Sequence, residues 1–268
     1  MLKDITLGQY LPGNSVVHRL DPRTKILLIA LLIAALFSVN SLAGYAVAAV
    51  FIFSINRIAG ITPRMVAKSV KPLLFFIVFT AVINLFLTDG EGKIWEFGII
   101  HLTREGIYLT LVMSFRLIFL VIGTSILTYT TSPIVLTDGI EALMRPLTKI
   151  GVPSHEIAMM MTIALRFIPT IIDETDKIMK AQSARGSDFE SGSLIHRAKA
   201  LIPILVPLFV SAFRRADELA MAMECRGYRG GEHRTKLKQL KFAPCDAGAV
   251  CISLAVFVLM ILCNIFAR

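Results

Sequence analysis

In the second half of the chain, two arginines stand directly before glycines where helical runs end, in the stretches SARGS and AMECRGYRGG. They are Arg185 and Arg226, which lie 41 residues apart (226 minus 185). A guanidinium group keeps its charge and forms bidentate hydrogen bonds with carboxylates, so the pair fits two acidic sites on a soluble partner. The alternative for each arginine taken singly is that a cation in the last turn of a helix stabilises the helix dipole by roughly 0.3–1 kcal/mol.

The segment before the first arginine is predicted to be one long amphipathic helix. From Ser154 to Ala184 the sequence repeats with a period of about 3.6 residues. We expect Ser154 to cap this helix and Pro169 to kink it, because proline lacks the backbone N–H that a helix interior needs. Its polar side is predicted to hold Arg166, Asp173, Lys177 and Lys180, and its apolar side Ile157, Met161, Ala164, Ile168, Ile171, Ile172, Met179 and Gln182.

The segment before the second arginine, residues 194–226, is apolar only at its centre. The apolar run from Ala200 to Phe213 has 14 residues, which is too short for a membrane span of ~20 residues. It is also interrupted by Pro203 and Pro207. Such a run is typical of a buried or interfacial helix.

A glycine follows each arginine at the position where a helix ends. Gly186 and Gly227 are expected to take the left-handed backbone conformation that terminates helices. Arg185 and Arg226 are then the last side chains of two helices in one module. The repetition favours a partner with two acidic sites over the dipole explanation alone.

Composition places the chain in a membrane. Hydrophobic residues make up 55% of it and charged residues 18%, against roughly 45–50% and about 25% in soluble domains. The net charge of +9 is explained by positive cytoplasmic loops rather than by nucleic acid, since no basic stripe alternates with exposed aromatic residues. The first 20 residues lack the pattern of a removable signal peptide, so we expect the N-terminus to be retained.

An all-α membrane fold with about five transmembrane helices is predicted. The apolar block 26–56 is expected to form two short spans that turn at the polar stretch SVNS. A third span, 72–87, is expected to extend one turn backwards. The fourth and fifth predicted spans are 106–129 and 247–266.

Charge asymmetry orients these spans. The N-terminal leader and segment 57–71 carry an excess of lysine and arginine, whereas segment 88–105 carries four acidic residues against two basic ones. Because cytoplasmic loops hold the excess of basic residues, the N-terminus is predicted inside the cell and segment 88–105 outside, as a loop. The predicted domains are 1–129 with the leader and four spans, 130–246 as a cytoplasmic coupling module, and 247–268 as the last span.

Other reactive residues predict neither a catalytic nor a metal site. The stretch HEIAM, residues 155–159, has methionine where a zinc protease needs its second histidine. The carboxylates of DETD, residues 173–176, fit a solvated helix face. The four cysteines form no C-x-x-C pair and are predicted to be structural thiols. No G-x-x-x-x-G-K-[ST] motif is present, so any ATP must bind to another chain.

Arg116 is the costliest residue inside a predicted span. A charge within a membrane segment faces protein and has a partner, or marks an ion pathway. No acidic residue lies in the other predicted spans, so its expected partners are carbonyl groups, Asn84 or water. We interpret Arg116 as a structural or inter-subunit contact.

Nearly the whole chain resembles the T component, the transmembrane coupling subunit, of energy-coupling factor transporters, a class of ATP-driven micronutrient importers. The resemblance rests on DPRTKILL before the first span, on LRFIPTIIDETDKIMKAQSARG, on LIPILVPLFVSAFRRADELAMAMECRGY and on the closing span. Cys225 stands where the family frequently has alanine, which leaves the neighbouring arginine intact. The family's two X-Arg-X motifs are matched by Ala184, Arg185 and Gly186 and by Cys225, Arg226 and Gly227.

The resemblance implies a mechanism. Two ABC-type ATPase subunits would each hold one of the two arginines in an acidic groove and would bind the ATP, so this chain itself needs no cofactor. Their closure would move the two crossed helices, which would tip a separate membrane protein, the S component, that carries a vitamin or a transition-metal ion. The implied location is the bacterial inner membrane. Contact with the S component is predicted for Met160, Met161, Pro203 and Pro207, with ordinary helix packing as the alternative.

Two other classes of function compete with this one. A secondary transporter or channel with its own pathway would need paired polar residues inside the spans, where only Arg116 and Asn84 qualify. An intramembrane enzyme would need a nucleophile or a metal pair within the spans, and the sequence shows neither. Neither alternative accounts for the repeated Arg-Gly helix ends.

Overall fold

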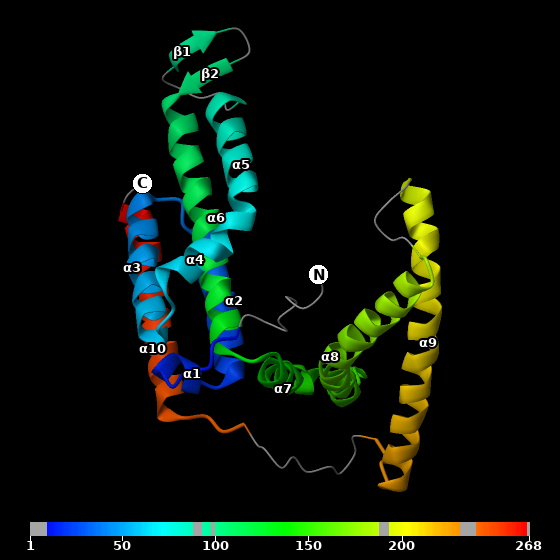
Figure 1. The fold of residues 1–268 in the computed structure, drawn as a ribbon. Helices are drawn as coiled ribbons and strands as arrows, with labels where there is room; N and C mark the ends of the chain where they lie inside the picture. The colour runs from blue at the N-terminus through cyan, green and yellow to red at the C-terminus, as the bar shows by residue number, and fades with distance from the viewer. Residues whose placement is uncertain (1–9, 88–92, 98–99, 188–192, 231–239, 267–268) are drawn as a thin grey trace. The chain divides into compact units, whose positions relative to one another are not determined.

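The computed structural model describes residues 10–87, 93–97, 100–187, 193–230 and 240–266. Within these ranges the chain is helical apart from one two-stranded hairpin, so the predicted all-α fold is confirmed (Figure 1). The chain divides into two compact units. We call Gly8–Gly139 with Leu240–Arg268 the bundle unit, and Met1–Leu7 with Ile140–Gln239 the arm unit.

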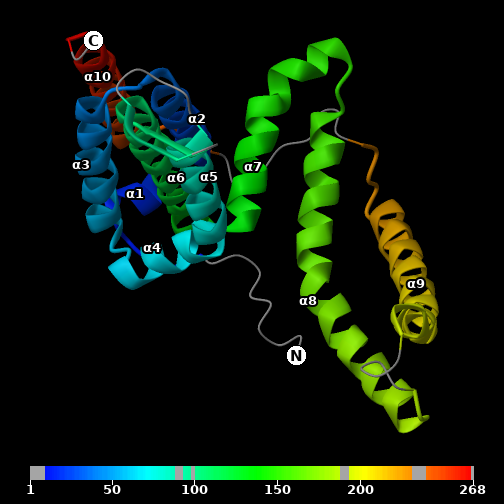
Figure 2. The same cartoon turned by 90° about the horizontal axis from the view of Figure 1, so that it is seen from above.

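In the bundle unit, helices α2 and α3 each pack against both α6 and α10, and α4 and α5 pack against α6 (Figures 1 and 2). Leu36 of α2, Ile52 of α3 and Met260 of α10 are buried where these helices meet. In chain order the elements are α1 (Val16–Arg19), α2 (Pro22–Ser38), α3 (Leu42–Ala59), α4 (Pro63–Val70), the 3-10 turn η1 (Lys71–Leu73), α5 (Leu74–Leu87), β1 (Lys93–Phe97), β2 (Ile100–Thr103), α6 (Arg104–Thr130), the beginning of α7 (Pro133–Met144) and α10 (Pro244–Phe266).

Helices α2 and α3 are separated by a tight turn within SVNS, so the predicted division of the apolar block into two helices is confirmed. Each helix begins with a capping side chain. The Asp21 carboxylate accepts a hydrogen bond from the N–H of Arg23 at 2.9 Å, and the Ser41 hydroxyl accepts one from the N–H of Gly44 at 3.2 Å. These caps satisfy backbone N–H groups that the first turn of each helix would otherwise leave unpaired.

The predicted backward extension of the third span is present as α4 and η1, which precede α5. Pro72 lies within η1, and its missing N–H explains why a 3-10 turn separates the two α-helices. Segment 88–105, which we predicted to be a loop, instead contains β1 and β2 in its described part. The two strands pair antiparallel, with Phe97 opposite Ile100. That prediction used charge alone and did not weigh the β-branched and aromatic residues of KIWEF and IHLT.

Five helical stretches are long and apolar enough to cross a membrane: α3, Pro63–Phe86 with α4 and α5, α6, α8 (Ser154–Ala184) and α10. Four of these coincide with predicted spans. The other predicted span is α2, whose 17 residues extend for about 26 Å. Helix α8 is the least apolar of the five, and we had assigned it to the cytoplasmic side because of its polar face. The membrane placement of α2 and α8 stays a prediction.

The arm unit consists of two long helices and the segment that leads into them. Helix α8 follows the end of α7 and the 3-10 turn η2 (Arg145–Ile150), and α9 (Leu194–Cys225) completes the unit. The prediction that Ser154 caps α8 is wrong, because Pro153 occupies the cap position and Ser154 is already the first helical residue. Pro169 lies at the middle of α8, and Figure 2 shows the helix changing direction about half-way along its length.

Candidate functional site

Helix α8 ends in two hydrogen bonds that define its last turn. The N–H of Ser187 donates to the carbonyl of Gln182 at 3.0 Å, and the N–H of Gly186 donates to the carbonyl of Ser183 at 3.0 Å. Gly186 has a φ of 89°, which only glycine adopts without strain. This pair of bonds is a Schellman motif, and Arg185 is the residue directly before its glycine.

Helix α9 ends in the same way. The N–H of Tyr228 donates to the carbonyl of Met223 at 3.0 Å, and the N–H of Gly227 donates to the carbonyl of Glu224 at 2.9 Å. Gly227 has a φ of 71°. Arg226 therefore holds the position in its motif that Arg185 holds in the other, and the two ends have one backbone geometry.

The Schellman motif itself does not require an arginine. The same two bonds end α3 and η2, where Gly60 has a φ of 73° and Gly151 a φ of 89°. The residues before these glycines are Ala59 and Ile150. Backbone termination therefore explains the glycines of the Arg-Gly pairs and leaves the arginines to be explained by something outside the backbone.

All six residues of the two helix ends are exposed: Ala184, Arg185, Gly186, Cys225, Arg226 and Gly227. Across the described residues, neither guanidinium group makes a hydrogen bond or an ion pair with another side chain. Each helix thus ends in an exposed cation. A carboxylate on another protein can pair with each one, because arginine offers two parallel donors to a carboxylate.

The two arginines lie at opposite ends of the arm unit. Gln182, in the last turn of α8, donates to the carbonyl of Pro203 in the first half of α9, so α8 and α9 pack antiparallel. From Pro203 the helix continues for 23 residues to Arg226 (226 minus 203), or about 34 Å along its axis. One acidic groove cannot hold both guanidinium groups over that distance, so the geometry requires two separate binding sites.

Arg116 is held inside the bundle unit by the turn between α2 and α3. Its Nε donates to the hydroxyl of Tyr45 at 3.0 Å, and its Nη2 donates to the carbonyl of Val39 at 3.1 Å and to Oδ1 of Asn40 at 2.8 Å. The expectation of a carbonyl partner is confirmed. Asn84 is not a partner, because its amide donates to the Thr80 carbonyl of its own helix at 2.8 Å.

The stretch DPRTKILL ties the beginning of α2 to the end of α6 and the beginning of α10. Lys25 Nζ donates to the carbonyl of Thr130 at 3.0 Å and to the hydroxyl of Thr131 at 3.1 Å. The backbone N–H of Asp21 donates to Oδ1 of the buried Asp246 at 2.8 Å. Polar clusters therefore clamp both ends of the bundle unit, with Arg116 in one cluster and Lys25 in the other.

Comparison with known proteins decides the family. Residues 13–237 match the family model described as "Cobalt transport protein", CbiQ. The chain is 55% identical over 269 residues to the energy-coupling factor transporter transmembrane protein EcfT of Clostridium kluyveri, which covers 99% of both chains. The chain belongs to the EcfT family. Two further EcfT relatives are those of Thermosediminibacter oceani, 56% identical over 92% of this chain and 93% of the relative, and of Bacillus subtilis, 44% identical over 93% and 94%.

In this EcfT-family chain, the predicted contact residues for an S component lie on the surface of the arm unit. Met160, Met161 and Pro203 are exposed and Pro207 is half-buried. The predicted apolar run of α9 forms a larger apolar surface, whose exposed positions the sequence did not specify. It is a stripe at positions i, i+4, i+7 and i+11, which we call the α9 stripe, and its members are Ile202, Val206, Phe209 and Phe213, exposed by 54%, 55%, 62% and 68%.

The polar residues that predicted no chemistry have structural partners in the arm unit. Nδ1 of His155 lies 3.1 Å from Oε1 of Glu141, which joins the beginning of α8 to α7. Glu174, within DETD, forms an ion pair with Arg215 of α9, so the solvated-face interpretation is wrong for this carboxylate. The described residues hold no cluster of three or more His, Cys, Asp or Glu side chains that fits a metal ion.

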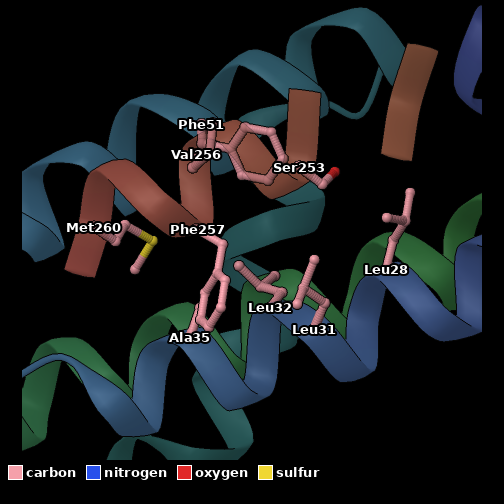
Figure 3. Close-up of a pocket in the computed structure, with 9 residues that line it drawn as sticks. All are labelled: Leu28, Leu31, Leu32, Ala35, Phe51, Ser253, Val256, Phe257 and Met260. Carbon is pink, nitrogen blue, oxygen red and sulfur yellow. The ribbon is translucent and has the colours of Figure 1, made fainter. Parts of the chain in front are cut away.

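A small groove in the bundle unit lies between α2 and α10, with Phe51 of α3 beside it (Figure 3). Its volume is about 10 Å³, and Ser253 supplies the one hydroxyl among the nine side chains around it. A space of this size holds about one water molecule. The groove is therefore a packing defect between helices and not a site for a micronutrient.

Proposed function

We propose that this chain is the transmembrane coupling subunit of an energy-coupling factor importer. It joins two ABC-type ATPase subunits to a separate membrane protein, the S component, that captures the substrate. The observation that carries the proposal is the pair of helix ends with the same hydrogen bonds, each with an exposed arginine; the end of α8 contacts α9 at Pro203, about 34 Å along the helix from Arg226. The printed names of the relatives, which describe energy-coupling factor transporter transmembrane proteins, support it.

Each arginine enters an acidic groove on one ATPase subunit. Arg185 and Arg226 have no side-chain partner among the described residues, so docking breaks no existing ion pair in the arm unit. The Schellman bonds fix the backbone from which each arginine side chain extends. A carboxylate pair formed there transmits force, because the cation is attached to a helix of 31 residues in α8 and 32 in α9.

The chain supplies no catalytic residue in this scheme. ATP is bound and hydrolysed by the partner subunits, and the chain needs no cofactor of its own. It resides in the bacterial inner membrane as a multi-pass protein with its N-terminus and arm unit on the cytoplasmic side. The excess of lysine and arginine in the leader and in segment 57–71 supports this orientation.

The α9 stripe, together with Met160 and Met161, binds the S component through apolar contact. Its side chains are exposed in the free chain, and a row of aromatic and branched side chains on one helix face is typical of helix-in-groove recognition. The substrate, a vitamin or a transition-metal ion, binds to the S component. Movement of the arm unit then tips the S component and opens its site inward.

The described residues of the bundle unit do not form the polar pair that the secondary-transporter alternative needs. It required Arg116 and Asn84 to form a polar pair within the spans. Arg116 instead bonds the turn between α2 and α3, and Asn84 bonds its own helix.

Reconstitution tests the proposal. The full chain is co-expressed with two ATPases and an S component, and the complex is placed in liposomes with ATP inside and outside in turn. We expect substrate uptake only with ATP on the cytoplasmic face, and loss of uptake in the double variant Arg185→Ala with Arg226→Ala. Arg229→Ala is the matched control, since Arg229 is exposed and also precedes a positive-φ glycine but ends no helix. ATP-independent uptake by the chain alone would contradict the proposal.

A further inference from the structure

Helix α9 contains two prolines four residues apart, Pro203 and Pro207. In an uninterrupted helix the N–H of residue 207 would donate to the carbonyl of residue 203. Proline has no N–H, so that intrahelical bond is absent and the carbonyl of Pro203 keeps acceptor capacity. A carbonyl freed in this way requires another donor or water.

The donor comes from the other long helix. Nε2 of Gln182 donates to the carbonyl oxygen of Pro203 at 3.2 Å. Gln182 is the one polar member of the residues predicted for the apolar side of α8, and it lies three residues before Arg185. Pro207 therefore frees a carbonyl acceptor on α9 at the place where α8 presents the Gln182 amide. This pairing explains why a glutamine lies on the apolar side of α8.

A second polar contact joins the same two helices. The carboxylate of Glu174 accepts a hydrogen bond from the hydroxyl of Ser211 and lies 2.6 Å from Nη2 of Arg215. The Glu174 and Arg215 side chains are 23% and 29% exposed, so the ion pair is largely shielded from solvent. Glu174 precedes Gln182 by eight residues and Ser211 follows Pro203 by eight, so the two contacts are matched about 12 Å apart along the antiparallel helices.

We infer that these two contacts pin the crossing of α8 and α9 and make the arm unit one rigid lever. Two contacts at different heights resist both sliding and scissoring, which a single contact would not. Gln182 and Glu174 are positioning residues in this scheme, and Pro207 acts by freeing the acceptor. The consequence rests on the proposed function: force applied at Arg185 also moves Arg226 and the α9 stripe, instead of bending one helix past the other.

Two proline variants separate this role from a general effect of proline. Pro207→Ala restores an N–H that competes for the Pro203 carbonyl, so the Gln182 bond weakens. Pro203→Ala is the matched control, because it makes the same side-chain change one turn away and leaves residue 207 without an N–H. Gln182→Leu removes the donor itself. Since Gln182 and Pro207 act through one bond, combining Gln182→Leu with Pro207→Ala should add nothing to either single change.

The distance between the ends of α8 and α9 reports whether the two contacts hold the helices together in the chain without its partners. Spin labels are attached to the exposed native Cys225 and to a cysteine introduced at the exposed Ala184, with Cys245, Cys251 and Cys263 replaced by alanine. Pulsed dipolar spectroscopy on the full chain in detergent should give one narrow distance distribution, which Pro207→Ala and Gln182→Leu broaden and Pro203→Ala does not. Equal distance distributions in Pro207→Ala and Pro203→Ala would contradict the claim that the contact between Gln182 and Pro203 fixes the crossing of α8 and α9.

Transport assays test whether the two contacts couple ATP hydrolysis to substrate import. In the reconstituted complex with its native cysteines, the substrate imported per ATP hydrolysed should fall about two- to tenfold in Pro207→Ala and Gln182→Leu. Retention of the ATPase subunits should not change, because both arginine ends are intact. The claim that the arm unit moves as one rigid lever would be contradicted by a variant with a broad distance distribution that still imports the same amount of substrate per ATP hydrolysed. A chain that retains no ATPase at all would contradict the proposed function, while the distance measurement would still decide whether the pin exists.

Discussion

Glu174 of α8 and Arg215 of α9 form an ion pair of 2.6 Å that joins the two helices ending in Arg185 and Arg226. The pair lies well inside the two helices and not at their ends. It therefore fixes how the helices cross without occupying either terminal arginine. The two terminal cations stay free for a partner, while the interior charges of the same helices are used within the chain.

Reversing the charge of Glu174 tests this relationship. Glu174→Arg should lower the free energy of unfolding of the arm unit by about 1–3 kcal/mol, because the change leaves Arg215 without its acceptor and adds a like charge. Combining it with Arg215→Glu should recover part of that loss in a double-mutant cycle followed by thermal unfolding of the purified chain. Asp173→Arg, at an exposed neighbour on α8, is the control. Equal losses for residues 173 and 174 would mean that helix charge and not the ion pair is responsible.

The two terminal glycines can be tested in the same manner. Alanine at Gly186 or Gly227 must adopt a positive φ, which costs about 1 kcal/mol or more. We expect a lower unfolding temperature and, because the arginine is displaced, weaker retention of one ATPase subunit in a pull-down assay. Gly248→Ala is the control, since Gly248 lies within α10 and a methyl group there meets open space. Undiminished retention in both terminal variants would show that the Schellman geometry does not position the arginines.

Arg116→Leu should destabilise the bundle unit by about 2–4 kcal/mol, because it removes three hydrogen bonds and leaves Oδ1 of Asn40 without its donor, while the Val39 carbonyl keeps only the Tyr45 hydroxyl. Uptake should fall only in proportion to the amount of folded protein recovered, as judged by size-exclusion chromatography. Asn84→Ala is the comparison, with a smaller expected effect. A folded Arg116→Leu chain that binds its partners but transports nothing would restore the pathway interpretation.

Serine in place of Phe209 and Phe213 should leave the fold intact, because both side chains are largely exposed in the described structure. The loss should appear in association with the S component, as about a tenfold or greater weakening per aromatic side chain in a detergent-solubilised binding assay. Met221→Ser is the matched control, since Met221 is equally exposed on α9 but lies outside the stripe. An equal effect of Met221→Ser would indicate general loss of hydrophobicity rather than a defined contact.

The sequence predicts the features of the arm unit that are local in the chain. Helical period, the Arg-Gly pairs and the apolar run of α9 depend on residues within a few turns of each other, so Gly186 and Gly227 take the expected left-handed conformation. Ser154 is the local exception, because Pro153 takes the cap position. Pro153 makes no capping hydrogen bond through its side chain, so the serine in the next position gave the stronger local signal.

Contacts between distant residues were beyond prediction. The partners of Arg116 come from a turn more than 70 residues earlier in the chain, and the acceptor of Gln182 comes from a helix that folds back along α8. Neither pairing leaves a period or a motif in the sequence. One signal was available: Pro207 has no N–H to donate to the carbonyl of residue 203, and Gln182 is a polar residue among apolar neighbours. Together they indicate an unpaired carbonyl acceptor at residue 203 and an unpaired amide donor at residue 182.

The number of ATPase subunits bound per chain tests the account most directly. Native mass spectrometry of the co-expressed complex should show two subunits with the unaltered chain, one with Arg185→Ala, one with Arg226→Ala and none with both changes. Each arginine end would then be one binding site, as expected when the end of α8 meets α9 at Pro203, about 34 Å along the helix from Arg226. Two retained subunits in the double variant, with Arg229→Ala behaving identically, would contradict the claim that the arginine helix ends carry the coupling.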